Sequence, residues 1–272
     1  MTAVTVQELN VYPLKSARGI PQARVRLGPR GFEWDRHWMA VTEDGLFLTQ
    51  RTHPLLTHIA TELTGDSLVL TAPGLTPLAL PLAPQGAARP IRLFTHSGEG
   101  LDQGAAAAAW VSQVLGQPAR IVRTPASPDR RANPAYAGPD PAPLAFPDGY
   151  PILVCNRASL DDLNGRMPEA LPMERFRPNL VIEGLPPFAE DRIGTIEIGP
   201  TTLKLVKPCT RCVIPSTDQR TGARGFDPLP VLRTFRFDRD LLGVTFGENA
   251  VIVRGAGEVL ERGAPCRVIY EN

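Results

Sequence analysis

The segment with the clearest chemical potential contains two cysteines, Cys209 and Cys212, separated by two residues and surrounded by cationic side chains. A thiolate is a soft, anionic metal ligand and a good nucleophile, and nearby cations favour the deprotonated form. Lys207, Arg211 and Arg220 are the cations closest to the two thiols in sequence. We therefore expect this segment to carry the chemistry of the protein.

Two common explanations of a Cys-x-x-Cys pair fit this sequence poorly. A four-cysteine zinc site normally needs a second close pair, whereas Cys155 and Cys266 stand alone. A dithiol redox motif should begin a helix, but the β-branched residues and proline of 213–215 follow the pair. The remaining interpretation is a thiolate on a loop that leaves a strand at 201–206, with the ladder ending at Pro208. Such a thiolate among cations suits an anionic cofactor bound through a metal.

Six blocks of this sequence resemble a known family and occur in the family's order. They are VYPLKS (11–16), GFEWDRHW (31–38), ASLDDLN (158–164), RFRPNL (175–180), CTRCVIPSTDQRTG (209–222) and FGEN (246–249). With these blocks the chain resembles the MOSC proteins of the amidoxime-reducing component type and the related bacterial hydroxylaminopurine-detoxifying enzymes. The resemblance covers nearly the whole chain.

The resemblance implies a molybdenum cofactor, molybdopterin, and gives its ligands. Cys212 would bind the molybdenum and serve as the catalytic residue, and Cys209 would be a neighbour. Cationic forks and hydrogen-bond donors on short loops suit the phosphate of such a cofactor. By resemblance, the residues that would hold the pterin or its phosphate are Lys15, Ser16, Arg36, Arg177, Asn179, Thr210 and Asn249.

Taken one at a time, these residues also have ordinary structural explanations. Lys15 and Ser16 would then form a solvated turn, Arg36 would be an exposed partner of Asp35, and Arg177 would be a surface charge at the start of a strand.

The activity implied by the resemblance is a molybdenum-dependent reduction of N-hydroxylated compounds to amines, with Asp218 or Asp35 as candidates for proton delivery. Because no cysteine cluster follows the last expected strand, the electrons would come from separate proteins, a flavoprotein reductase and an iron-sulfur or haem carrier. One alternative is a MOSC module that binds the cofactor, or carries sulfur on Cys212, without reductase activity. Another is a structural protein with zinc or no metal.

Composition narrows the partners and the compartment. The 272 residues carry a net charge of +1, which gives no drive toward nucleic acid. The sequence begins without a signal-like leader and contains no apolar run long enough to span a bilayer. Four cysteines, only two of them close in sequence, argue against a secreted disulfide framework. We expect a cytoplasmic protein with no membrane or nucleic-acid partner.

The pattern of apolar residues predicts mostly strands. The expected strands are 4–12, 23–27, 37–42, 59–63, 67–71, 90–94, 150–155, 179–183, 195–198, 202–206, 250–254 and 266–270. Asp44 and Gly45 predict a hairpin turn. Helices are expected at 104–115, where alanines precede an apolar stripe that ends at Gly116, and at 158–165, with an acidic first turn.

Eight prolines between 124 and 151 predict a long loop without regular structure. The fold class that we expect is α+β, mostly β. An N-terminal MOSC-type β domain (1–122) would be followed by a MOSC β-barrel domain (123–272), with Cys266 in the core of the latter.

Overall fold

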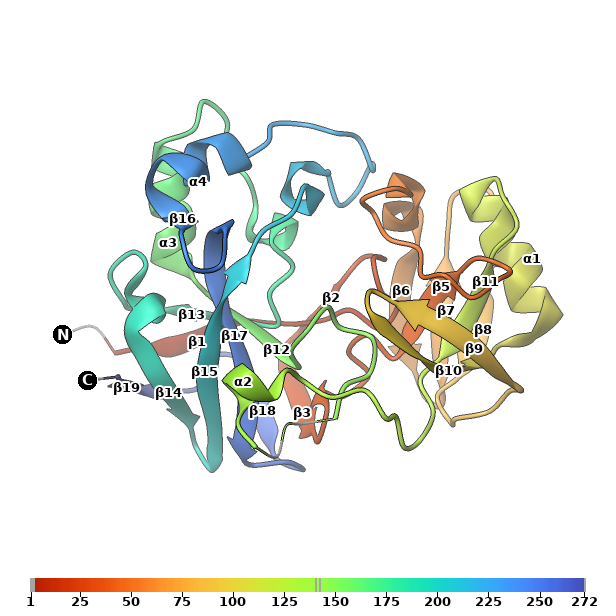
Figure 1. The fold of residues 1–272 in the computed structure, drawn as a ribbon, viewed down its shortest axis with the longest axis horizontal. Coiled ribbons are helices and arrows are strands. Elements are labelled where there is room, and N and C mark those ends of the chain that lie inside the picture. The colour runs from red at the N-terminus through yellow and green to blue at the C-terminus, as the bar shows by residue number, and fades with distance from the viewer. Residues whose placement is uncertain (1–2, 140, 142, 272) are drawn as a thin grey trace.

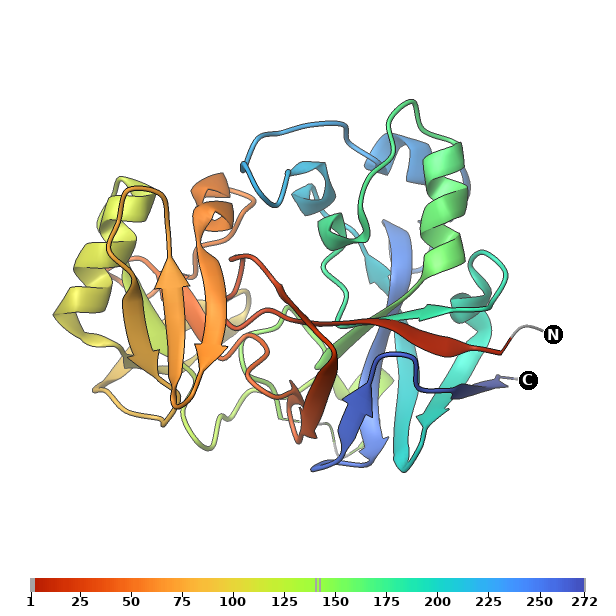
Figure 2. The same cartoon turned by 180° about the vertical axis from the view of Figure 1, so that it is seen from behind.

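The computed structural model describes residues 3–139, 141 and 143–271. Met1, Thr2 and Asn272, at the ends of the two expected domains, and Asp140 and Ala142 of the proline-rich segment lie outside the described residues. The described chain is rich in strands and has few helices, which confirms the expected mostly β class. Figures 1 and 2 show two groups of strands joined by long irregular segments.

The larger group is a nine-stranded sheet with the order β19-β14-β15-β17-β12-β13-β1-β2, in which β16 also pairs with β17. Its strands are β1 (Thr5–Val11), β2 (Ile20–Gln22), β12 (Ile152–Asn156), β13 (Leu180–Glu183), β14 (Ile193–Ile198), β15 (Thr201–Thr210), β16 (Phe237–Asp238), β17 (Gly243–Arg254) and β19 (Cys266–Tyr270). The pair β12 and β13 is parallel, and α3 (Arg157–Gly165) lies in the crossover that a parallel pair requires.

Backbone hydrogen bonds close this sheet into a barrel. The Val6 amide donates to the Ala264 carbonyl at 2.9 Å, and the Cys266 amide donates to the Val4 carbonyl at 2.8 Å. The beginning of β1 is thereby joined to the segment that leads into β19. Apolar side chains of β1, β12, β13, β14, β15 and β17 fill the interior.

Strands of the smaller group form two sheets, ordered β5-β11-β10-β9 and β6-β7-β8. Their bounds are β5 (Trp38–Val41), β6 (Ala60–Thr64), β7 (Ser67–Thr71), β8 (Leu78–Pro81), β9 (Ala88–Leu93), β10 (His96–Asp102) and β11 (Arg120–Arg123). A third small sheet joins β3 (Arg24–Gly28) and β4 (Gly31–Phe32) to β18 (Val259–Glu261). Strands from both expected domains thus share sheets, because β1 pairs with β13. The division at residue 122 stays a prediction.

Helix α1 (Gly104–Leu115) has the bounds that its sequence predicts. Its alanine run has high helix propensity, and Ala107, Trp110, Val111 and Leu115 bury one face against the smaller sheets. Gly116 ends the helix with φ 67°, a left-handed conformation that glycine adopts without strain. No helix in residues 3–139, 141 and 143–271 is long and apolar enough to cross a bilayer.

Five further helical segments connect the strands near the larger sheet, and one precedes β6. They are α2 (Pro134–Ala137), α4 (Leu229–Arg236), η2 (Met173–Arg175), η3 (Ala189–Arg192) and η4 (Ile214–Ser216), with η1 (Pro54–His58) before β6. Phe176 and Phe246 stack with ring centroids 4.1 Å apart in an apolar cluster that includes residues of α3 and α4. This cluster supports the loop that leads into β13.

The structure corrects several local expectations. Strand β15 does not end at Pro208 but continues to Thr210, because irregular register on both sides of Pro208 relieves the need for its missing amide. Helix α3 begins at Arg157 with Asn156 as its N-cap and has no acidic first turn. The proline-rich segment contains one short helix, α2. Cys266 is only partly buried against the barrel core.

Candidate functional site

One pocket brings together the predicted metal ligand and all the predicted cofactor-binding residues. This deep pocket, of about 150 Å³, is lined by Lys15, Ser16, Arg36, Arg177, Asn179, Thr210, Cys212 and Asn249. Further lining residues include Thr49, Arg51, Asp148, Tyr150, Phe176, Cys209 and Arg211. Segments from both halves of the chain therefore build the same pocket.

A second hollow of about 370 Å³, called here the mouth, continues the deep pocket. It shares the residues from Cys209 to Cys212, together with Arg51, Asp148 and Asn249. Phe94 and Lys207 line the mouth and not the deep pocket. Cys212 thus lies where a buried polar site meets a wider opening.

The cations that neighbour the two thiols are only partly those nearest in sequence. Arg211 donates from Nη1 to the Cys209 sulfur at 3.0 Å and from Nη2 to the Phe176 carbonyl at 2.7 Å. Burial alone would lower the pKa of Arg51, but its contacts with Asp148 and Cys212 have the larger combined effect, so the pKa is raised. Arg220 lies elsewhere and pairs with Glu174 at 3.6 Å. Arg51, a cation distant in sequence, thus lies near Cys212 in addition to Arg211.

Lys15 is buried, in contrast to the solvated turn that its sequence position allows. Its side chain is 5% exposed, and its ammonium donates to the Phe146 carbonyl at 2.9 Å and to Asp148. Burial lowers the pKa of Lys15 to about 8, because desolvation outweighs the ion pair with Asp148. Arg51 also pairs with Asp148, at 3.0 Å. Partial desolvation raises the pKa of Asp148, but these two cations outweigh it and hold that pKa well below its usual value.

Arg36 and Arg177 hold the ring of Tyr12 between them. Their guanidinium carbons lie 4.2 Å and 4.3 Å from the ring centroid. Arg36 also donates to the Arg177 carbonyl at 3.2 Å and pairs with the buried Asp35. The aromatic ring lies between two like charges and attracts both. Neither arginine is the exposed charge that an isolated reading of the sequence allows.

A pair of buried glutamines connects Arg177 to the loop of Ser16. Gln50 and Gln219 exchange two amide hydrogen bonds, at 2.9 Å and 3.0 Å. Gln219 Oε1 also accepts from Arg177 Nη1 at 2.9 Å, and Gln50 Nε2 donates to the Ser16 carbonyl at 2.7 Å. Gln219 Nε2 donates its second hydrogen to the Thr217 carbonyl. These contacts fix two walls of the deep pocket relative to each other.

The remaining polar residues of the predicted site differ in how many hydrogen bonds they make to backbone groups. Asn179 accepts from Arg36 at 3.1 Å and from the Leu153 amide at 3.2 Å, and donates to the Asn10 carbonyl. Asn249 donates to the Lys207 carbonyl at 3.1 Å. Thr210 is exposed at the end of β15. Asn179 therefore joins three strands at the wall of the pocket.

Backbone conformation is unusual at three of these residues. Ser16, Arg36 and Arg177 have φ values of 68°, 52° and 56°, a region that residues with side chains rarely adopt. Such conformations cost free energy and persist where surrounding contacts enforce them. All three residues line the deep pocket, so the strain is concentrated where the pocket needs fixed polar groups.

The charges of the deep pocket fit an anionic group. Five cations line it, Lys15, Arg36, Arg51, Arg177 and Arg211, and Asp148 is the one carboxylate among the described lining residues. The Nη2 of Arg177 and the Nε of Arg211 are buried without a hydrogen-bond partner in the described part of the chain. Unsatisfied buried donors of this kind suit phosphate oxygens, and the nearby Cys212 offers a soft ligand for a metal.

Metal binding by protein side chains alone has no comparable candidate. The described residues contain no group of three or more His, Cys, Asp or Glu side chains placed to hold a metal ion. Cys155, Cys209, Cys212 and Cys266 are all free thiols. Cys209 and Cys212 are thus two free thiols that line the cationic pocket.

Sequence reasoning missed four residues of the site and misplaced its carboxylate. Arg51, Asp148 and Gln50 have no sequence pattern that distinguishes them from surface polar residues, and Gln219 lies in the 209–222 block without a feature that indicates its partner. The expected proton-delivery candidates do not line the pocket. Asp35 accepts from the Tyr12 amide at 2.8 Å, and Asp218 pairs with Arg175 at 3.2 Å.

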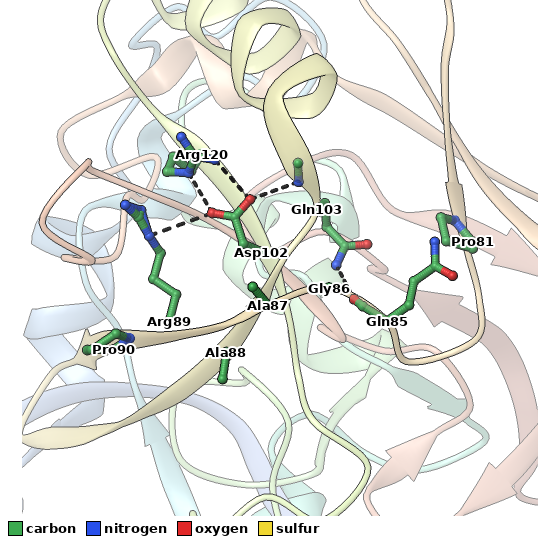
Figure 3. Close-up of a pocket in the computed structure, with 11 residues that line it drawn as sticks. Pro81, Gln85, Gly86, Ala87, Ala88, Arg89, Pro90, Asp102, Gln103 and Arg120 are labelled. Atoms are coloured by element: carbon green, nitrogen blue, oxygen red, sulfur yellow. Dashed lines mark hydrogen bonds and ion pairs between the residues drawn. The ribbon is translucent and has the colours of Figure 1, made fainter.

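A larger hollow elsewhere has its charges already paired. It measures about 580 Å³ and lies between β8, β9 and the start of α1, as Figure 3 shows. Asp102 accepts from Arg120 at 2.5 Å and 3.0 Å and lies 3.6 Å from Arg89. It also accepts from the Gly104 amide at 2.8 Å. These contacts hold the strand ends and the helix together.

Comparisons with known proteins match almost the whole chain. Residues 3–118 match the family model described as MOSC N-terminal beta barrel domain, and residues 141–268 match the MOSC domain. Mitochondrial amidoxime-reducing component 1 of Homo sapiens is 33% identical over 267 residues, which cover 91% of this chain and 78% of that protein. Mitochondrial amidoxime reducing component 2 of Bos taurus is 34% identical and covers 85% and 72%, respectively.

A relative with a different name is similar over a comparable stretch. Molybdenum cofactor sulfurase of Danio rerio is 31% identical over 269 residues, which cover 90% of this chain but 32% of that protein. The similarity therefore concerns one part of a much longer chain.

Proposed function

Because this chain belongs to the MOSC family that includes the mitochondrial amidoxime-reducing components, we propose that it binds a molybdenum cofactor and reduces N-hydroxylated compounds to amines. The observation that carries the proposal is the deep pocket, where five cations and two cysteine thiols converge from segments far apart in sequence. The pocket thus contains two kinds of group with different binding roles. The cations suit a phosphate, and the thiol suits a soft metal.

In this proposal Cys212 is the molybdenum ligand, and the cofactor's pterin and phosphate are held by the other pocket residues. Lys15, Ser16, Arg36, Arg177, Asn179, Thr210 and Asn249 are the proposed binding residues. When bound, the cofactor supplies a redox-active molybdenum able to deliver two electrons to an N–O bond. Overall, the substrate gains two electrons and two protons and releases water.

The protein's own groups orient the reactants and set the local charge. Arg36 and Arg177 are fixed by Tyr12 and by Gln219, so their donors are in place before an anion arrives. Asp148 faces both the deep pocket and the mouth and accepts hydrogen bonds from Lys15 and Arg51. A substrate N–H group that enters the mouth finds there an acceptor carboxylate.

Metal and pterin content of the purified protein tests the proposal. Cys212→Ser should lose molybdenum, while the matched variant Cys209→Ser should retain it, because Cys209 is a neighbour of the metal and not its ligand. Both proteins are produced in a host that makes molybdenum cofactor. Zinc or no metal in the wild type, or full molybdenum in Cys212→Ser, would contradict the assignment.

Reduction itself requires a second measurement. The wild type should reduce an amidoxime with an artificial electron donor, and in the cell we propose that the electrons come from separate proteins, a flavoprotein reductase and an iron-sulfur or haem carrier. The proposed compartment is the cytoplasm. Cofactor-loaded protein that reduces no N-hydroxylated compound would contradict the reductase function.

An alternative function is favoured by one observation, the similarity to molybdenum cofactor sulfurase over 90% of this chain. In this alternative the protein binds the cofactor, or carries sulfur on Cys212 as a persulfide, without reducing a substrate. Mass spectrometry of the peptide that contains Cys212 would then show an added mass of about 32, which corresponds to one sulfur atom in a persulfide. Absence of that sulfur in an active reductase would exclude the carrier role.

A further inference from the structure

The wall of the mouth includes an exposed aromatic residue. Phe94 is 46% exposed and lines the mouth together with Cys212 and Tyr150. Its ring is therefore an accessible apolar surface in the hollow that the proposed metal ligand also lines.

The backbone at Phe94 is also strained. Leu93 and His96 pair across β9 and β10, so that Phe94 and Thr95 form a two-residue hairpin loop. Phe94 is the first loop residue and has φ 56°, a conformation that favours glycine at this position. A phenylalanine at this position has a backbone conformation that glycine would adopt with less strain, but it places an aromatic ring at the mouth.

Three neighbours fix the ring. Phe47 lies 4.6 Å away between ring centroids, at an interplanar angle of 55°. Lys15 Nζ and the Arg51 guanidinium carbon each lie 5.5 Å from the Phe94 centroid. Both cations also contact Asp148, the carboxylate of the mouth. The ring of Phe94 thus contacts two cations that line the deep pocket.

We propose that Phe94 is a specificity-determining residue whose ring stacks planar aromatic N-hydroxylated substrates at the mouth. This inference rests on the proposed reductase function and names the substrate class for the same site. A planar aryl group gains area against Phe94, and Tyr150 supplies a second aromatic surface in the same hollow. Amino groups on the substrate can donate to Asp148. An aliphatic substrate has the same reacting group but gains no stacking.

The test compares two substrates that differ only in the group attached to the amidoxime. Benzamidoxime and acetamidoxime are assayed with the molybdenum-loaded protein and an artificial electron donor, and the ratio of their kcat/KM values is the readout. Phe94→Gly should lower the benzamidoxime-to-acetamidoxime ratio by about 2- to 10-fold, the range expected for one aromatic contact. Phe94→Tyr should retain the ratio.

Thermal stability separates this role from packing. Phe94→Gly relieves the positive φ, so it should keep or gain stability while the substrate ratio falls. Leu242→Gly is the matched control, because Leu242 is 80% exposed with φ 49° and does not line the mouth. It should leave the ratio unchanged. An unchanged ratio in Phe94→Gly, with lower stability, would identify Phe94 as a packing residue and overturn the assignment.

A binding measurement distinguishes failure of this inference from failure of the proposed function. Calorimetry without an electron donor gives the dissociation constants of both amidoximes for the wild type and for Phe94→Gly. If neither amidoxime is reduced, the reductase function fails, and the ratio of dissociation constants still decides the role of Phe94. A ratio that Phe94→Gly does not change refutes the stacking role even in an active reductase.

Discussion

The contact between the two glutamines allows a quantitative prediction for Gln219→Met. Methionine has a similar volume but none of the four hydrogen bonds that Gln219 makes to Gln50, Arg177 and Thr217. Gln50 is fully buried and Gln219 is 5% exposed, so water does not easily replace the lost partners. The substitution leaves polar groups of Gln50 and Arg177 unsatisfied.

The expected cost follows from the number of groups left without partners. Both ends of the Gln50 amide lose the Gln219 partner, and so does Arg177 Nη1. Each buried unsatisfied group costs about 1–3 kcal/mol. Gln50 Nε2 keeps the Ser16 carbonyl as a partner, and some relaxation will follow. We therefore expect a loss of about 2–4 kcal/mol in the free energy of unfolding.

Urea denaturation of four proteins measures this loss. They are the wild type, Gln219→Met, Gln50→Met and the double variant, with Gln113→Met on the exposed face of α1 as a control that should change stability by less than about 0.5 kcal/mol. The double variant should cost less than the sum of the single variants, by about 0.5–3 kcal/mol. Additive costs, or a loss below about 1 kcal/mol for Gln219→Met, would refute the reasoning.

Two other substitutions test the burial of Lys15 and the close packing of Gly247. Because the pKa of Lys15 falls from 10.5 to about 8 on folding, the unfolded chain holds more protons between these pH values, and wild-type stability should rise with pH across that window. Lys15→Met should therefore be more stable than the wild type near pH 7, by up to about 3 kcal/mol in the free energy of unfolding. Urea denaturation should show this difference shrinking toward pH 10.5. A difference that stays constant with pH would contradict the burial cost assigned to Lys15. At Gly247, with φ 75°, an added Cβ would lie 2.6 Å from the Cys155 sulfur, so Gly247→Ala should cost about 3 kcal/mol in thermal unfolding. Gly257→Ala, with φ 96° and open space around the Cβ, should cost only about 1 kcal/mol, and equal losses would refute the packing argument.

Local patterns predicted the elements that depend on local physics. Helix α1 has its predicted bounds because alanine propensity, an apolar stripe and a terminal glycine all act within twelve residues. Strands β7 and β19 likewise have the predicted bounds. Pro208 was misread as the end of β15, since whether a proline interrupts a ladder depends on the register of the partner strand, β17.

The residue types of the candidate site were also visible in the sequence. A thiol pair among cations predicts a soft ligand near anionic groups, and the family-like blocks point to Lys15, Arg36 and Arg177. Whether a charged residue is solvated or buried is not a local property, because it depends on what packs against it from distant segments. The sequence fits the ordinary explanation of these residues as surface charges equally well, and only their burial excludes it.

Only the tertiary structure decided which groups meet in the pocket. Arg51 lies beside Cys212, and Asp148 joins Lys15 to Arg51, although neither had a distinguishing sequence pattern. Gln50 and Gln219, from the two halves of the chain, form a hydrogen bond with each other. The sequence by itself determined that a thiol, several cations and mostly β structure would be present, since these depend on residue type and short-range periodicity. The partners, burial and pKa directions of those groups depend on long-range packing, which places side chains together through folding of the whole chain.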